Sequence, residues 1–553
     1  MVRKTRYAVT TGAILAAALI LAACGSGSGN SAGDSSGATQ PTSGATGESS
    51  APSGGALHIS AAEPSAGLDP ATAVTQASKR VMELIYDTLI DYNEKNELIP
   101  MIAEKWALSD DKLSYVFTLR ANAMFSDGNP ITTDDVVYSL NRMQQSEALK
   151  AQLAGVTKIE ATGDHEVTVT LDAPSRVFLN ALATVGSAAI LSQKAVDGNA
   201  DYFTKPTATS GPWYLDDIVS HGSATLKANG HYWNAGYPKF ATINYDFATD
   251  STAMAAALET GTIDMTYNMV PADAVRLKAS GAIDNHLAPS AGLIAWGLNK
   301  SHSPFDNKDV RQAVAYVVPR EDAMQTCWSG IGPVSYGDLI FEGQNFYAKG
   351  EQRFQLDKDA AIQKAGQLLD SAGWVMGSDG VREAKGVTGV EDGTKLAFNV
   401  PYENSWAQAR CNTEMLQQYL KPLGVAATPE AYDKASFYSD AGAGKFTMYH
   451  MGNNYATVDD YIGQTFTCEG SANAILTQYC NERVDELVNE ARATDDVQKA
   501  TDNYRQVQDI ILDEQPVIPI GAQYAAIGTS PKLQGFYPRA DASNRSLIYA
   551  TLG

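Results

Sequence analysis

Alternating apolar and polar residues mark several short stretches of the chain as strands with one buried face. In 114–125 the apolar side chains of Tyr115, Phe117 and Leu119 fall on one side, and a dense turn signal follows at 126–130. The same alternation, or a short apolar run bounded by prolines, occurs elsewhere. We therefore predict further strands at 57–60, 166–171 and 517–520.

Other stretches repeat their apolar residues every three or four positions, which is the spacing of helices. A helix is expected after Thr132, because Asp135 stands three residues on, in the position of a capping box. Glycine or proline follows most of the remaining stretches, as is typical of helix ends. These predicted helices are 251–258, 310–318, 361–372, 414–420 and 504–512. Strands and helices mix along two long sections, which predicts an α/β protein with two lobes, each centred on a sheet.

The N-terminus has the organisation of a secretory signal. Arg3, Lys4 and Arg6 precede the apolar run 13–23, which is too short to span a membrane. The residues Leu-Ala-Ala-Cys at 21–24 resemble the lipobox of bacterial lipoproteins. This resemblance implies that residues 1–23 are removed and that Cys24 carries a lipid.

The segment after Cys24 contains no material for a hydrophobic core. Of the 31 residues 25–55, 9 are Gly and 9 are Ser, with no aromatic or large aliphatic side chain. Such a composition is typical of a flexible coil. We therefore expect 24–55 to tether a folded protein to the outer face of the cell membrane.

Composition and charge narrow the class of protein further. An apolar fraction of 44% is ordinary for a globular chain of 553 residues, while 41 Lys and Arg against 63 Asp and Glu give a net charge of −22. Nucleic-acid binding needs a collected basic surface, so this excess of acid argues against it. Beyond the N-terminus, no run of about 18 apolar residues suggests a membrane-spanning helix.

Four cysteines remain after Cys24, and an exported protein keeps disulfides. Three pairings are possible. Cys468 and Cys480 enclose a short polar loop, which favours a local bond and leaves Cys327 to pair with Cys411. Metal binding by these cysteines is disfavoured, because the short C-x-x-C spacing of metal sites is absent.

The sequence has no strong sign of catalysis. It lacks the H-E-x-x-H and P-loop motifs, and its G-x-S-x-G match at 33–37 lies inside the tether, where no strand and helix can flank it. Acidic pairs such as Asp459-Asp460 occur at turns or helix starts, and we expect them to be mostly solvated. His450 is a lone histidine and predicts no metal site. We expect neither enzyme activity nor a cofactor.

A series of motifs, in order from about residue 55 to 521, resembles the family 5 solute-binding proteins of ABC importers, the oligopeptide- and dipeptide-binding group. The longest stretch is 103–137, which is similar to the signature region of that family almost throughout. Trp213 and Trp233, within two of the shorter motifs, are interpreted as packing residues. These shorter motifs are 68–70, 210–213, 229–233, 258–264, 298–299, 304–306, 310–313, 368–373, 420–425 and 515–519.

The resemblance implies a type II periplasmic-binding-protein-like fold with a ligand cleft between two lobes. The first lobe is expected at 56–292, including an extra subdomain at about 94–206, and the C-terminal segment 522–553 returns to complete it. The second lobe is expected at 293–521. The two strands that cross near 292 and 521 are expected to form a hinge.

The resemblance also implies a function and partners. The chain is expected to capture peptides, most readily oligopeptides, and to deliver them as a monomer to the permease and ATPase subunits of the importer. Two alternatives remain open. The fold is also compatible with a sensing or scaffolding lipoprotein of the cell envelope that does not transport, or with binding of a non-peptide solute.

Ligand contacts are expected mainly around the two segments that line the site in relatives. In the dipeptide-binding branch an Asp pairs with the amino terminus of the peptide, and the matching position here holds Asn454, unless a register shift brings in Asp459 or Asp460. That branch also places an Arg two residues before Tyr402, where this chain has Val400. A strict preference for free dipeptides is therefore disfavoured. The candidate contacts are Asn453, Asn454, Tyr455, Tyr402, Trp406 and Trp328.

Overall fold

The computed structural model describes residues 54–553 except 74, 96, 148, 154, 268, 289–290, 456, 495, 523 and 540–542. Cys24, the signal and nearly all of the tether lie outside these residues. None of the helices in the described part of the chain has the length and apolar character needed to cross a membrane.

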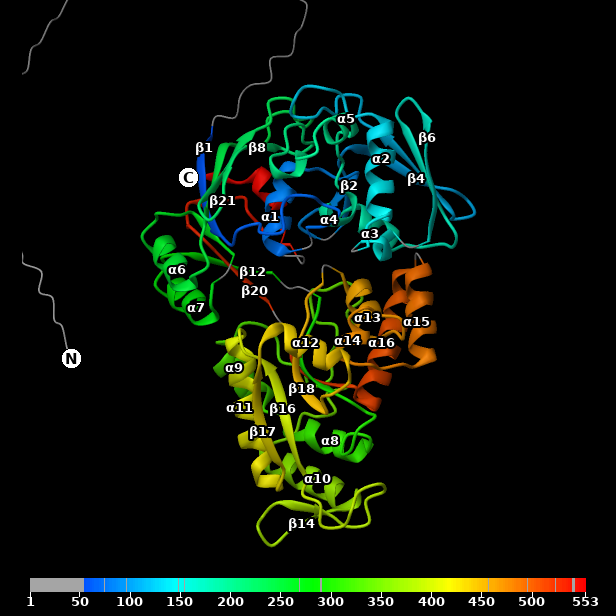
Figure 1. Ribbon diagram of the computed structural model, residues 1–553, viewed down its shortest axis with the longest axis vertical. Coiled ribbons are helices and arrows are strands. Elements are labelled where there is room, and N and C mark those ends of the chain that lie inside the picture. Colours follow the sequence, from blue (N-terminus) through cyan, green and yellow to red (C-terminus); the bar gives the residue numbers. More distant parts are fainter. Residues whose placement is uncertain are drawn as a thin grey trace, which may run out of the picture. The chain divides into compact units, whose positions relative to one another are not determined.

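The first lobe is built on a seven-stranded sheet that combines the beginning and the end of the folded chain. Its strand order is β12-β20-β11-β1-β10-β9-β8, in which β1 runs parallel to both β10 and β11. Figure 1 shows the red C-terminal segment in the same lobe as the blue β1. The strands are β1 (Gly54–Ala61), β8 (Trp213–Val219), β9 (Ser223–Ala228), β10 (Phe240–Phe247), β11 (Met265–Thr266), β12 (Asp284–Ala288) and β20 (Ala525–Thr529).

A second, four-stranded antiparallel sheet of order β4-β5-β7-β6 belongs to the same lobe. Its middle strands have the predicted alternation, with residues 115, 117 and 119 of β5 buried, as are 167, 169 and 171 of β7. Helix α2 follows β5 and begins with the predicted capping box, in which Thr132 and Asp135 bond each other's backbone amides. The elements are β4 (Ala103–Leu108), β5 (Ser114–Leu119), β6 (Val156–Gly163), β7 (Glu166–Leu171) and α2 (Thr133–Gln144).

One continuous hydrophobic core joins both sheets of the first lobe. From the end of the chain it includes Ile527, Leu533, Phe536, Leu547, Ile548 and Ala550. Short helices and strand pairs complete the lobe. They are α1 (Gln76–Ile85), β2 (Ile90–Tyr92), β3 (Leu98–Pro100), η1 (Lys150–Leu153), α3 (Phe178–Leu182), α4 (Val185–Ala188), α5 (Gln193–Asp197), η2 (Tyr202–Thr204), α6 (Ser251–Glu259), α7 (Pro271–Ala279), β21 (Leu533–Gln534), η4 (Arg545–Tyr549) and β22 (Thr551–Leu552).

The second lobe has its own cores, formed by residues 291–520. At its centre lies a three-stranded antiparallel sheet of order β18-β13-β19, and the parallel pair β16 and β17 packs beside it. Its strands are β13 (Ile294–Leu298), β14 (Trp374–Met376), β15 (Arg382–Ala384), β16 (Ala397–Glu403), β17 (Ala426–Tyr432), β18 (Met448–Gly452) and β19 (Val517–Gly521).

Helices surround these strands, and the predicted ones occur where the three- and four-residue spacing placed them. They are α8 (Lys308–Val317), α9 (Arg320–Cys327), α10 (Lys358–Ser371), α11 (Ala407–Leu420), η3 (Lys421–Leu423), α12 (Lys434–Gly442), α13 (Val458–Phe466), α14 (Asn473–Leu476), α15 (Glu482–Ala493) and α16 (Val497–Glu514).

The chain passes between the lobes twice, each time through a short connection. β12 of the first lobe ends at Ala288 and β13 of the second begins at Ile294, while β19 ends at Gly521 and β20 begins at Ala525. Both connections meet the same end of the three-stranded sheet, because Ile294 pairs with Gly521 and with Gly452. This end of the sheet therefore faces the border between the lobes.

Candidate functional site

The candidate residues Asn453, Asn454 and Tyr455 follow β18 directly and so lie at this border. The Asn453 side chain is hydrogen-bonded to two residues of the second lobe. Its Oδ1 accepts from the Leu293 amide at 3.2 Å, and its Nδ2 donates to Thr465 Oγ1 at 3.0 Å. The facing residue Gly292 has φ +155°, and a Cβ there would lie 2.0 Å from the Asn453 carbonyl oxygen. Asn453 therefore shapes the border through its backbone and amide.

Tyr455 and Asn454 differ in how far they are exposed. Tyr455 forms a two-residue antiparallel bridge with Ala291, and its ring stacks on Tyr461 with centroids 6.2 Å apart. Burial raises the pKa of the Tyr455 phenol, so the hydroxyl is neutral and able to donate or accept at neutral pH. Asn454, by contrast, has an exposed side chain. Of these three residues, Asn454 is the most exposed.

Tyr402 and Trp406 come from the neighbouring strand and the helix that follows it. Tyr402 is nearly buried near the end of β16, and Trp406 stands at the N-terminus of α11, half-buried. A Cβ on Gly452 would lie 2.4 Å from the Trp406 ring, so glycine at this position lets the indole lie against the end of β18. The structure thereby joins Trp406 to the segment 453–455.

Trp406 belongs to a group of four aromatic rings that meet edge to face. Its ring meets that of Trp328 edge-on at 5.7 Å and that of His450 at 4.9 Å, and His450 in turn meets Trp296 at 5.2 Å. Trp328 is only 3% exposed. We therefore assign Trp328 to the support of Trp406 rather than to the surface, as is usual for a buried indole.

Two disulfides lie in the second lobe, and one of them supports this aromatic group. Cys327–Cys411 ties the end of α9 to the first turn of α11, next to Trp328 and Trp406. Cys468–Cys480 closes the loop after α13. These are the pairs that loop size favoured. The first bond holds the helix that carries Trp406 in place.

A register shift would bring Asp459 or Asp460 into the place of Asn454, but both carboxylates already accept hydrogen bonds from other residues of the protein. Asp459 is buried, which makes the expectation that this acidic pair is solvated wrong for that residue, and its carboxylate binds Arg176 and Tyr504. Asp460 Oδ2 accepts from Thr457 Oγ1 at 2.9 Å, and the Asp460 amide donates back to Thr457 as a helix cap. The Asp459 carboxylate is thus bound elsewhere, and one oxygen of Asp460 is held by Thr457.

His450 is the one histidine among the candidate chemistry, and it is structural. It is 2% exposed, and its Nε2 lies 3.0 Å from Asn412 Nδ2. Burial lowers the pKa of His450 to about 3. In the described ranges, no group of three or more His, Cys, Asp and Glu side chains is arranged to hold a metal ion.

The buried His450 predicts a loss of stability in mild acid. Between pH 6.5 and 3 the unfolded state binds a proton that the folded state does not, so stability falls as the pH falls. From pH 7 to 5 this amounts to about 2 kcal/mol of unfolding free energy. In His450→Phe, which keeps a ring between Trp296 and Trp406, urea titrations at the two pH values should show a correspondingly smaller difference. An equal difference in both proteins would mean that His450 titrates normally.

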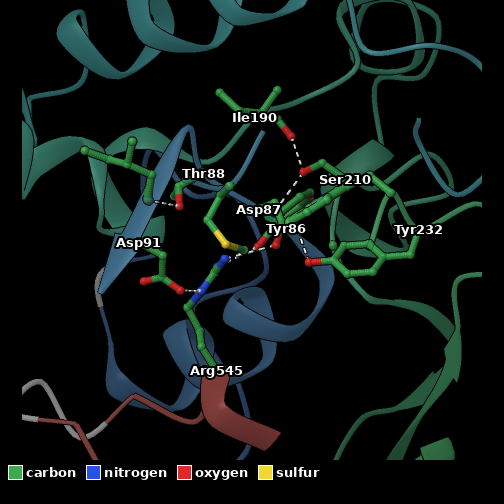
Figure 2. A network of polar contacts seen from close by, with 12 residues as sticks. Tyr86, Asp87, Thr88, Asp91, Ile190, Ser210, Tyr232 and Arg545 are labelled. Atoms are coloured by element: carbon green, nitrogen blue, oxygen red, sulfur yellow. Dashed lines mark hydrogen bonds and ion pairs between the residues drawn. The ribbon is translucent and has the colours of Figure 1, made fainter. Parts of the chain in front are cut away.

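A second constellation, in the first lobe, was not foreseen from the sequence. Figure 2 shows Arg545 between two buried carboxylates: Nε donates to Asp91 at 2.7 Å and Nη2 donates to Asp87 at 3.0 Å. Tyr232 Oη and Trp233 Nε1 also donate to Asp87, at 2.9 and 3.0 Å. The usable signal was two acids four residues apart within the otherwise uncharged, mainly apolar stretch 84–92.

The charges of this network are satisfied by one another. Burial raises the pKa of Asp87, whereas at Asp91 burial is outweighed by Arg539 and Arg545, which lower the pKa. A small pocket beside the network is lined by these same residues. Because each acid already faces a cation, the network is suited to joining the C-terminal segment to the lobe and not to binding a solute.

Comparison with known proteins defines the class. Residues 97–473 match the family model of bacterial extracellular solute-binding proteins, family 5. The glutathione-binding protein GsiB of Salmonella typhimurium is 27% identical over 489 residues, covering 86% of this chain and 90% of that protein. Di/tripeptide-binding protein 1 of Pseudomonas aeruginosa is 24% identical, covering 82% and 86%.

Solved structures share the fold. The oligopeptide-binding protein AppA of Bacillus subtilis, in complex with a nonapeptide, has a TM-score of 0.72 at 22% identity and covers 91% of this chain and all of its own. NikA of Brucella suis, in complex with Fe(III)-EDTA, has a TM-score of 0.78 at 19% identity, with coverage of 90% and 100%.

The chain belongs to the family 5 extracellular solute-binding proteins, which serve ABC importers. Its fold is the two-lobed type II fold that the sequence motifs implied. The relatives are binding proteins and not enzymes, in agreement with the interpretation of this chain.

Proposed function

We propose that this chain is the solute-binding lipoprotein of an ABC importer that captures peptides. In this proposal Cys24 carries the lipid, residues 24–55 form the tether, and the monomer delivers its solute to the permease and ATPase subunits. The observation that carries the proposal is the position of the candidate residues at the end of β18, where the chain crosses between the lobes.

The second lobe supplies the proposed wall of the site. Asn454 offers an exposed amide, Trp406 a half-buried indole and Tyr402 an aromatic ring at the end of the adjacent strand. Binding sites for small solutes combine apolar walls with a few polar groups in this way. A bound extended peptide needs partners for the N–H and C=O groups that it buries, and we propose that polar side chains of this wall supply some of them.

The charges of the wall favour some peptides over others. Val400 is 1% exposed in the core and offers nothing to a carboxylate, and Asn454 cannot neutralise an ammonium group. Asp459 and Asp460 are engaged elsewhere. The solute we propose is therefore an oligopeptide, or a peptide with modified ends, in preference to a free dipeptide.

Binding changes the solute in no covalent way. The lobes are expected to close by movement about the two connections near 292 and 521, which makes ligand affinity and closure parts of one equilibrium. The extra subdomain at about 94–206 and the return of 522–553 remain parts of the first lobe in this proposal.

The test uses a Cys24→Ser protein, which we expect to leave the membrane fraction and which simplifies measurement in solution. Peptides of two to nine residues, end-blocked peptides and glutathione are added while thermal unfolding and tryptophan fluorescence are followed. A true solute at about 100 times its dissociation constant stabilises the folded protein by about 2.7 kcal/mol. Trp406→Leu should weaken its binding about ten-fold or more, as loss of an aromatic anchor does.

Trp374→Leu is the control, because it removes another indole of the second lobe, on the strand β14, which is 3% exposed where Trp406 is half-buried. It should lower stability and leave affinity unchanged. If no peptide stabilises the protein, peptide is the wrong class of solute. If peptides bind equally well to Trp406→Leu, the proposed wall is wrong although the function stands.

A further inference from the structure

Arg176 reaches from the first lobe into the second. It lies in the loop between β7 and α3, and its guanidinium binds the Asp459 carboxylate with both ends, at 3.1 Å through Nη1 and 2.7 Å through Nη2. Asp459 belongs to the first turn of α13, five residues after Asn454. The ion pair therefore joins the lobes close to the proposed site.

The Asp459 carboxylate is held in place to bind this arginine. Its side chain is 2% exposed, and it also accepts from Tyr504 Oη of the second lobe and from Asn180 Nδ2 of the first, the latter at 3.4 Å. Asn180 is held by Tyr92, whose hydroxyl donates to Asn180 Oδ1 at 2.6 Å. A two-pronged, charge-assisted pair of this kind is the strong form of hydrogen bonding.

Arg176 makes further contacts with the second lobe. Its Nη2 donates to the Ala491 carbonyl oxygen at 3.2 Å, and its backbone amide donates to the Arg492 carbonyl oxygen at 2.9 Å. The guanidinium also lies 4.7 Å from the ring centroid of Phe346. One residue of the first lobe thus contacts three separate segments of the second.

We propose that Arg176 and Asp459 form a latch that holds the lobes together without a solute. When the lobes separate, Asp459 keeps its bond from Tyr504 and both charged groups regain water, so opening leaves neither one buried and unpaired. The latch is therefore reversible. Bonds to charged groups of this kind shift an equilibrium by about ten-fold each, which is enough to make the closed form of the empty protein a substantial population.

The first lobe contains a close counterpart that serves as a control. Arg142 binds Asp69 with both ends, at 2.6 Å each, and lies 4.6 Å from the ring centroid of Phe203. Its exposure resembles that of Arg176, 24% against 21%. This pair is internal to one lobe, so its loss removes the same kind of interaction without freeing the lobes.

The experiment compares wild type, Arg176→Met and Arg142→Met after any bound solute has been removed, as verified by native mass spectrometry. Small-angle X-ray scattering is recorded at low ionic strength. We expect a larger radius of gyration for Arg176→Met than for wild type, and an unchanged one for Arg142→Met.

Equal radii for wild type and Arg176→Met at low salt would overturn the latch. Expansion of Arg142→Met to the same degree would overturn it too, since the effect would then reflect general loosening. Asp459→Asn offers a second variant, which keeps the side-chain shape and should expand as Arg176→Met does. No solute is present, so the result is independent of whether peptides prove to be the cargo.

Discussion

Removal of the Cys327–Cys411 disulfide is expected to lower the unfolding free energy of the second lobe by about 4–5 kcal/mol. The bond joins cysteines 84 residues apart, so breaking it gives the unfolded chain the freedom of a long loop. It also joins α9 to α11 beside Trp328 and Trp406. Urea unfolding of Cys327→Ser/Cys411→Ser, followed by far-ultraviolet circular dichroism, measures the loss.

The second disulfide provides the internal comparison. Cys468 and Cys480 are only 12 residues apart, and the same loop argument gives about 3 kcal/mol for Cys468→Ser/Cys480→Ser. Solute affinity should fall in the first double variant and stay closer to wild type in the second. A larger stability loss for the short loop than for the long one would show that loop entropy does not govern these bonds.

Arg545→Met is expected to destabilise the first lobe by about 3–5 kcal/mol, the typical cost of leaving a buried charge without its partner. Arg545 is the cation shared by Asp87 and Asp91, and it also donates to the Tyr86 carbonyl oxygen at 3.0 Å. Without it, Asp87 stays buried and loses its cation, whereas Asp91 keeps its ion pair with Arg539. Thermal and urea unfolding of the variant measure the cost.

The stability of Arg545→Met should depend on pH in a distinctive direction. A buried carboxyl without its cation has a raised pKa, so its neutral form favours the folded state. The Arg545→Met protein should therefore recover part of its lost stability as the pH falls from 7 toward 5. Adding Asp87→Asn to the variant should restore part of the stability at pH 7 as well, because Asp87 loses its cation while Asp91 still pairs with Arg539.

Arg382→Met is the matched control in the second lobe. Arg382 is equally buried, but it donates mainly to carbonyl oxygens, including that of Leu423 at 2.8 Å, and its acidic partner Asp370 is 61% exposed. Removing the Arg382 guanidinium therefore leaves no buried carboxylate without a cation. A cost as large as that of Arg545→Met, with the same recovery in acid, would contradict the explanation by buried charge.

Local patterns were sufficient to predict many elements because they report local physics. The alternation in 114–119 and 166–171 reproduces the burial of β5 and β7 residue by residue. The Thr132 and Asp135 capping box needs only neighbouring residues to form, and α2 begins there. The ordered motifs also identified the family and its two-lobed fold, since those motifs are tied to turns and helix ends of the fold.

The environment of charged side chains was harder to foresee. Asp459 looks like an ordinary acid in the first turn of a helix, yet its carboxylate is buried by Arg176, 283 residues earlier in the chain. Arg545 meets Asp87 across a separation of 458 residues. Periodicity carries no information about such pairs, because it depends on neighbours in sequence.

The candidate wall illustrates the same division. The resemblance named Asn453, Asn454, Tyr455, Tyr402, Trp406 and Trp328 as candidate contacts, with core positions favoured for the two tryptophans. Their packing differs. The absence of a side chain at Gly452 leaves room for the Trp406 ring, and the Trp328 ring packs edge-on against that ring. The Asn453 side chain is hydrogen-bonded to Leu293 and Thr465. Exposure leaves Asn454 and Trp406 as the strongest candidates to meet a solute.

Strand and helix positions, the family and the lack of a charge at 400 and 454 could thus be read from the order of the residues, because backbone preference and apolar periodicity act over a few positions. Contacts between segments that are far apart in the chain decide the rest. They determine which acid is buried, which tryptophan is accessible and where the two lobes contact each other. Those contacts arise only when the chain has folded, since burial and ion pairing depend on distance in space.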